Sequence, residues 1–185
     1  MILKITKYGE KVLREKATPV PQVTPKLVEL AADMIDTMHK ARGVGLAAEQ
    51  VGRTEALCVI DVPLDCEDDD ETREFNARVE MPLVMFNPQI LKLEGEQEGR
   101  EGCLSFPNMG APLKRAAEVT AQYMDEKGVP QIITVRGFLA RAVQHETDHL
   151  KGVLYVDLLE EADRAKIEKK IQALKGKTEK AAQKA

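Results

Sequence analysis

The sequence predicts an α+β fold, in which antiparallel or mixed β-sheets pack around a central helix, with a helix toward each end of the chain. Two observations carry this prediction. Strand-like segments follow one another in runs instead of alternating regularly with helices, which argues against a repeating βαβ pattern. The chain has 185 residues, 43% of them hydrophobic and 31% charged, which suits the core and surface of one domain.

The N-terminal part predicts a short strand and a helix. Residues 2–6 (ILKIT) are strand-like, and a proline-rich stretch follows them. Thr24 and Pro25 form a typical helix start, an N-cap followed by a proline in the first turn. Apolar residues then recur every three or four positions over the predicted helix 25–42, and Gly43 is expected to end it.

The middle of the chain predicts strands and an acidic loop. Residues 56–62 (ALCVIDV) are typical of a buried strand. Residues 65–74 (DCEDDDETRE) indicate an exposed loop, which belongs to an acidic surface insertion over 65–79. Residues 83–96 (LVMFNPQILKLEGE) supply two strand candidates that the Asn-Pro pair 87–88 separates.

The C-terminal part predicts a hairpin and two helices. Residues 117–124 and 131–137 are expected to form antiparallel strands around the turn 125–130. A helix is expected over 137–150, and another over about 160–174.

Charge is unevenly distributed along the chain. The net charge is −4, but seven lysines and two glutamates give residues 166–185 a charge of +5, so residues 1–165 carry −9. We therefore divide the chain into one domain, 1–165, and a basic helix end and tail, 166–185. This basic end either keeps the protein soluble or meets an anionic partner. We expect a reduced, cytoplasmic protein, because the sequence shows no apolar run of membrane length, no signal peptide and only three cysteines.

The most informative segment is QHETDH, residues 144–149, on the predicted central helix. His145 and His149 are four residues apart, so they share one helix face and can bind one metal ion. Glu146 then lies beside the ion without ligating it, where a general base for water belongs. A pair of surface histidines on an amphipathic helix is the alternative.

A catalytic metal needs a third protein ligand. The long metalloprotease pattern HExxHxxGxxH places a histidine where this chain has Tyr155, so the ligand must come from elsewhere. Cys103, in the segment EGCLS, is a candidate, because a thiolate binds Zn²⁺ or Fe²⁺ strongly and the next backbone N–H, of Leu104, can face an oxyanion. Taken alone, Cys103 is more often a buried small hydrophobe.

The segment GVGLAAEQ, residues 43–50, is the third element. Its small residues let the main chain lie close to a ligand, and Gln50 offers an uncharged N–H donor. By itself the segment reads as a helix C-cap that leads into a tight turn.

Together, GVGLAAEQ, EGCLS and QHETDH resemble the three signature motifs of the peptide deformylase family, in this order and at these separations. The likeness extends over nearly the whole chain. The resemblance implies removal of the N-formyl group from the initiator methionine of nascent polypeptides, with release of formate. It implies one divalent ion, most often Fe²⁺, with Zn²⁺, Ni²⁺ or Co²⁺ as substitutes, ligated by Cys103, His145 and His149.

The resemblance also assigns the other site residues. Glu146 is the general base, Gln50 and the Leu104 N–H stabilise the oxyanion, and the substrate backbone binds along Val44, Gly45 and Leu46. The expected partners are N-formyl-methionyl peptides and nascent chains, without a membrane or DNA. Residues 166–185 are a candidate ribosome contact.

Two other readings compete with this one. A metallopeptidase would need a further histidine or glutamate ligand, and no third histidine lies near the central helix. A structural zinc site would usually show paired cysteines a few residues apart, and the chain has none.

Overall fold

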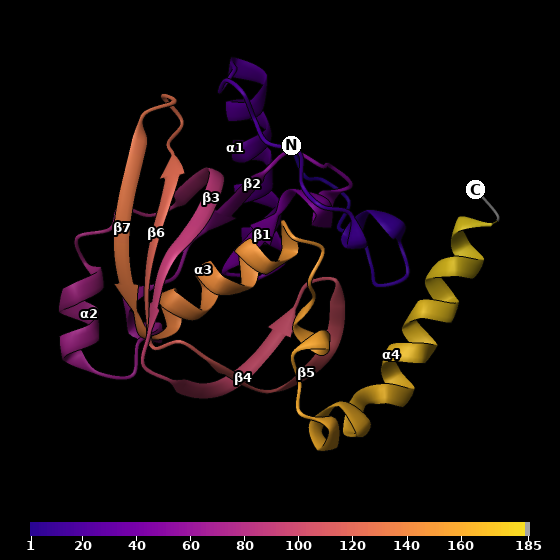
Figure 1. Ribbon diagram of the computed structural model, residues 1–185. Coiled ribbons are helices and arrows are strands. Elements are labelled where there is room, and N and C mark those ends of the chain that lie inside the picture. The colour runs from indigo at the N-terminus through magenta and orange to yellow at the C-terminus, as the bar shows by residue number, and fades with distance from the viewer. Residues whose placement is uncertain (184–185) are drawn as a thin grey trace.

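The computed structural model describes residues 1–183 and confirms the α+β class (Figure 1). Five antiparallel strands form one sheet in the order β1-β2-β3-β6-β7, and β4 and β5 form a separate hairpin. The elements are the strands β1 (Gly45–Ala47), β2 (Leu57–Ile60), β3 (Leu83–Glu94), β4 (Gln97–Cys103), β5 (Phe106–Arg115), β6 (Glu118–Met124) and β7 (Pro130–Arg136) and the helices α1 (Pro25–Lys40), α2 (Asp70–Asn76), α3 (Gly137–His149) and α4 (Glu161–Ala182).

The helix α3 lies between the large sheet and the β4–β5 hairpin (Figure 1). Ten of its 13 residues are buried, as expected for a helix that is covered on all sides. Its apolar side, including Leu139 and Val143, packs against Val119 and Val135 of the sheet. This burial fixes the position of every side chain that α3 presents to the hairpin.

The helix α1 covers the other side of the sheet. Its buried residues include Ala31, Met34 and Met38, which pack with Leu57 and Phe86 of β2 and β3. Fully burying a methionine, leucine or phenylalanine side chain stabilises the fold by about 1.5–3 kcal/mol.

The prediction that Gly43 ends α1 is wrong by one residue, because Arg42 holds the left-handed position. Arg42 has the left-handed conformation, with φ of 57°, and its N–H donates to the His39 carbonyl. The Gly43 N–H donates to the Met38 carbonyl, which completes a Schellman motif. Gly43 also lies against the second motif, because a Cβ there would lie 2.7 Å from Cδ1 of Leu104 and that side chain would have to move.

The expected break at residues 87–88 is a bulge inside one strand, β3. The register against β6 shifts between Phe86 and Gln89, where Asn87 has a φ of 51°. The Asn87 amide exchanges two hydrogen bonds of 2.7 Å with the backbone of Val20, which fixes this conformation. A bulge lets a strand bend without ending, so the two predicted strands are one.

The acidic segment 65–74 is not the exposed loop that the sequence predicts, because it contains α2. The Asp69 carboxylate accepts from the Thr72 N–H and caps this helix. Glu67 is buried, and its carboxylate accepts hydrogen bonds from the N–H groups of Phe138 and Leu139 in the first turn of α3. The segment therefore holds the start of the central helix.

Two further predictions differ from the structure. Residues 2–6 lie in no strand, although the Thr6 N–H donates to the Gln50 carbonyl, which ties this segment to residues 43–50. The hairpin of β4 and β5 has no counterpart in the sequence prediction. The predicted β6–β7 hairpin is confirmed.

The helix α4 is longer than predicted and continues to Ala182, so most of the expected basic tail is helical. Ile167 and Ile171 are buried with Leu13, Phe106 and Leu154, so α4 is packed onto the domain. Lys184 lies outside the described residues. No helix in the described part of the chain is both long and apolar enough to cross a membrane.

Candidate active site

The predicted histidine pair lies on α3 as the helical spacing requires. The ring centroids of His145 and His149 are 5.0 Å apart. Nδ1 of His145 lies 3.0 Å from Oε2 of Glu101, which leaves Nε2 of this ring as the ligand atom. Burial lowers the pKa of His149 well below its usual value, so that ring is held neutral, as a metal ligand must be.

Cys103, at the end of β4, joins the two histidines. Its Sγ lies 3.3 Å from Nε2 of His149, and the three ligand atoms of Cys103, His145 and His149 all lie within 4.8 Å of one another. One sulfur and two imidazole nitrogens suit Fe²⁺ or Zn²⁺. Cys103 and His145 also line a cavity of about 650 Å³, so a fourth coordination position has room for water or substrate. This open side distinguishes the site from a structural zinc site.

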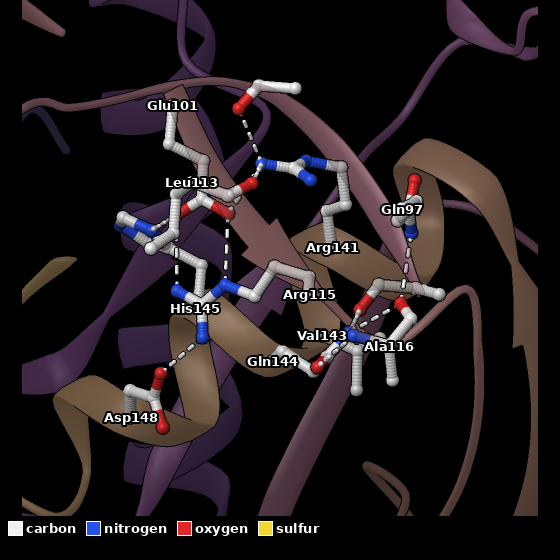
Figure 2. Close-up of polar contacts among 12 residues, drawn as sticks. Gln97, Glu101, Leu113, Arg115, Ala116, Arg141, Val143, Gln144, His145 and Asp148 are labelled. Atoms are coloured by element: carbon white, nitrogen blue, oxygen red, sulfur yellow. Dashed lines mark hydrogen bonds and ion pairs between the residues drawn. The ribbon is translucent and has the colours of Figure 1, made fainter. Parts of the chain in front are cut away.

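A buried ion network orients His145 (Figure 2). The Glu101 carboxylate accepts two hydrogen bonds from Arg115, at 2.9 and 3.0 Å, and one of 3.0 Å from Arg141. Arg115 also pairs with Asp148 on α3. Burial opposes ionisation of Glu101, but the bonds from His145 and Arg115 lower its pKa to about 2. The charged carboxylate therefore fixes the ring of His145.

Arg141 and Asp148 belong to this network, and neither was predicted from the sequence. A signal for Arg141 was present, because it lies four residues before His145 and therefore on the same helix face. Asp148 lies seven residues after Arg141, which returns to this face after two turns.

Glu146 lies beside the three ligand atoms without belonging to their group. It is 4% exposed, and its Oε2 has no hydrogen-bond partner among the described residues. Burial raises the pKa of Glu146 to about 7, in the range where a carboxyl group can accept and release a proton near neutral pH.

Residues of the segment GVGLAAEQ lie close to the candidate metal ligands and to Glu146. Oε1 of Gln50 accepts from the Ala47 N–H at 2.9 Å, which fixes the amide orientation, and Nε2 lies 3.3 Å from Sγ of Cys103. A Cβ at Gly45 would overlap the carboxylate of Glu146, so only glycine fits there.

Two of the three predicted substrate-binding residues line the cavity, and the third does not. Val44 and Gly45 line the cavity, as does Leu104. The side chain of Leu46 is fully buried in the core with α1 and does not line the cavity. Because Leu46 is 0% exposed as a whole residue, its main chain is also closed to the cavity in this structure.

The fold and this site define a metal-dependent hydrolase, in which a cysteine and two histidines of an HExxH helix form a group that could hold the ion. The family model for polypeptide deformylase matches residues 2–165. The chain belongs to the peptide deformylase family, whose members remove the N-formyl group from nascent polypeptides, and this is its reaction.

Similar proteins support this assignment over almost the whole chain. The peptide deformylase of Endomicrobium trichonymphae is 42% identical over 173 residues, which cover 94% of this chain and 95% of that one. That of Desulfitobacterium hafniense is 41% identical over 163 residues, which cover 88% and 98% of the two chains. The crystal structure of the enzyme from Thermus thermophilus has a TM-score of 0.82 at 36% identity and covers 98% of this chain and 99% of that one.

The Gly45→Ala variant is expected to lose about 100-fold in kcat, because the new methyl group displaces the Glu146 carboxylate and a misplacement of about 1 Å has this effect. Formate release from a formyl-Met peptide measures the loss. Gly176→Ala is the matched control, since no atom lies within 4 Å of its added Cβ, and it should keep the wild-type rate. Equal rates for both variants would contradict the close approach.

Proposed function

We propose that Cys103, His145 and His149 hold one divalent ion and that Glu146 is the general base of the deformylation. The observation that carries this proposal is the convergence of three ligand atoms within 4.8 Å at the wall of an open cavity, with a buried carboxyl beside them. An ion at that position lowers the pKa of water and polarises a carbonyl group. Glu146 accepts the proton of the attacking water and delivers it to the leaving amine nitrogen.

Gln50 and the N–H of Leu104 are the proposed donors to the oxyanion that forms at the formyl carbon. The amide of Gln50 is held by Ala47, so its Nε2 is oriented before substrate binds. Lys7 donates to the Leu104 carbonyl at 2.7 Å, which restrains the loop after Cys103. A donor of this kind stabilises the transition state by about 3 kcal/mol.

The substrate main chain is proposed to bind along Val44, Gly45 and Leu46. β1 is the edge strand of its sheet, and within residues 1–183 it pairs only with β2, so its other edge has no strand partner and could pair with an extended peptide. Gly45 faces Glu146, which supports a position of the formyl end beside the three candidate metal ligands for a peptide paired with this edge.

We further propose Fe²⁺ as the native ion. Enzyme purified without oxygen should contain iron and release formate from formyl-Met peptides, and it should lose activity in air as the iron and the thiolate oxidise. The same protein loaded with Ni²⁺ should keep its activity in aerobic buffer. Equal decay of the two forms, or anaerobic protein that holds zinc alone, would contradict iron.

The basic end, 166–185, is proposed to bind the ribosome, which places the enzyme beside nascent chains in the cytoplasm. Lys166, Lys169 and Lys170 are exposed on α4, and residues 1–165 form the catalytic domain in this division. Because Ile167 and Ile171 belong to the core, a truncation would damage the fold, and charge reversal is the sharper test.

The triple variant with Lys166, Lys169 and Lys170 changed to glutamate should lose co-sedimentation with ribosomes at low salt but keep its rate on a free formyl-Met tripeptide. The reason is that lysine–phosphate contacts release counterions and depend strongly on salt. The control reverses three exposed lysines elsewhere, Lys26, Lys127 and Lys151. Unchanged ribosome binding by the α4 variant would remove this proposal and leave the deformylase reaction untouched.

A further inference from the structure

The mouth of the active-site cavity carries positive charge on a protein whose first 165 residues sum to −9. Lys7, Arg42 and Arg100 line the cavity, and both arginines are exposed. The carboxylates that line it are those of Glu101 and Glu146, and both are buried. Neither Arg42 nor Arg100 forms an ion pair with any residue of the described chain. Two guanidinium groups are therefore free to meet an anion.

The backbone at Arg42 and the backbone beneath Arg100 are both unusual. Arg42 has a φ of 57°, a conformation that costs a residue other than glycine about 1–2 kcal/mol. The guanidinium of Arg100 lies across the hairpin over Gly110, where an added Cβ would come within 3.3 Å of its Nε. The hairpin thus has space for the Arg100 side chain because Gly110 has no side chain of its own.

A bound peptide must leave the cavity past these groups. Its formyl end lies near Gly45 and Glu146, and the chain cannot continue inward, because Leu46 to Gln50 are buried. It leaves along residues 41–44, which line the cavity. Arg100 lies three residues before Cys103 on β4, about 10 Å along an extended strand, and Arg42 lies three residues before Gly45 in the turn after α1. That length corresponds to three residues of substrate, so the arginines face the side chains that follow methionine.

We propose that Arg42 and Arg100 make this deformylase prefer formyl-methionyl chains with aspartate or glutamate at the second to fourth positions. The inference rests on the deformylase reaction and adds a substrate class to it. Free guanidinium groups at the mouth of a cavity attract carboxylates and raise the rate of productive encounter. Lysines at the same positions of the substrate are disfavoured by repulsion. Lys7 adds to the field, although its ammonium is already bonded to Leu104.

The test compares kcat/KM for three C-terminally amidated peptides: formyl-Met-Asp-Glu-Ala, formyl-Met-Ser-Gln-Ala and formyl-Met-Lys-Lys-Ala. At low ionic strength the acidic peptide should exceed the basic one about tenfold, with the neutral peptide between them. At about 0.5 M salt, where charges are screened beyond a few ångströms, the ratio should fall to about twofold or less.

Two variants assign the preference to the arginines. The double variant Arg42→Glu, Arg100→Glu should reverse the order of the peptides, and Arg42→Gly, which suits the left-handed conformation, should reduce the ratio without loss of stability. Lys26→Glu is the control, because Lys26 lies near the other end of α1, about 20 Å from Arg42. It should keep the wild-type order.

Equal kcat/KM for the three wild-type peptides would overturn the proposal, and so would an unchanged order in the double variant. A uniform loss on all three peptides would show that the arginines serve the fold or another anion. Failure to release formate from any of the peptides would instead contradict the deformylase reaction itself.

Discussion

Replacement of Glu146 by glutamine is expected to lower kcat about 1,000-fold while the metal content stays at the wild-type level. General acid–base catalysis by one side chain contributes about 10²- to 10⁴-fold, and glutamine cannot take up the proton. The metal should remain, because Cys103, His145 and His149 form the ligand group without Glu146. Glutamine also has the shape of the protonated carboxyl, which burial favours at this position by raising its pKa to about 7.

Metal analysis and formate release on the same preparation separate the two roles of this residue. Retained metal with lost turnover supports a base, and lost metal would identify Glu146 as a ligand. Wild-type turnover in the variant would place the base elsewhere. Glu146→Asp is a useful companion, since it keeps the carboxylate but withdraws it by one methylene group and should show an intermediate rate.

The part of the site that lies on one helix could be predicted from the sequence. His145, Glu146 and His149 are fixed relative to one another by the period of α3 alone. Cys103 is different, because it is 42 residues away on β4 and no local pattern joins it to the helix. The resemblance to the peptide deformylase family implied that Cys103 is a ligand. The distance of 3.3 Å between its Sγ and Nε2 of His149 agrees with that assignment.

Two of the errors in the predicted fold, the β4–β5 hairpin and the buried Glu67, share one physical cause, which is stabilisation by distant residues. The β4–β5 hairpin has glycine, proline and charged residues of low strand propensity. It is held to α3 by Arg141, which donates to the carbonyls of Gly99 and Leu113. Glu67 looks like one more residue of an acidic loop, yet it is buried because the free N–H groups at the start of α3 need an acceptor. No window of the sequence contains both partners of such contacts.

The second large effect is expected at the cysteines, where the chain offers its own controls. Cys103→Ser should lose most of its metal and at least about 100-fold in kcat/KM, because a neutral hydroxyl is a far weaker ligand than a thiolate. Cys66 is exposed, so Cys66→Ser should match the wild type in metal content, rate and stability. Cys58 is fully buried in the sheet, so Cys58→Ser should lose about 1–3 kcal/mol of unfolding free energy and keep its metal.

Metal content, chemical denaturation and formate release on the three variants test this pattern, because each variant should change a different quantity. A stable Cys103→Ser protein with a full complement of metal would show that the ion is held without the thiolate. Loss of metal from folded Cys58→Ser would indicate that the cysteine ligand is Cys58 in the sheet core and not Cys103 at the end of β4. Only the expected pattern assigns the metal to the cavity wall, where Cys103 completes the group that the helix alone leaves with two ligands.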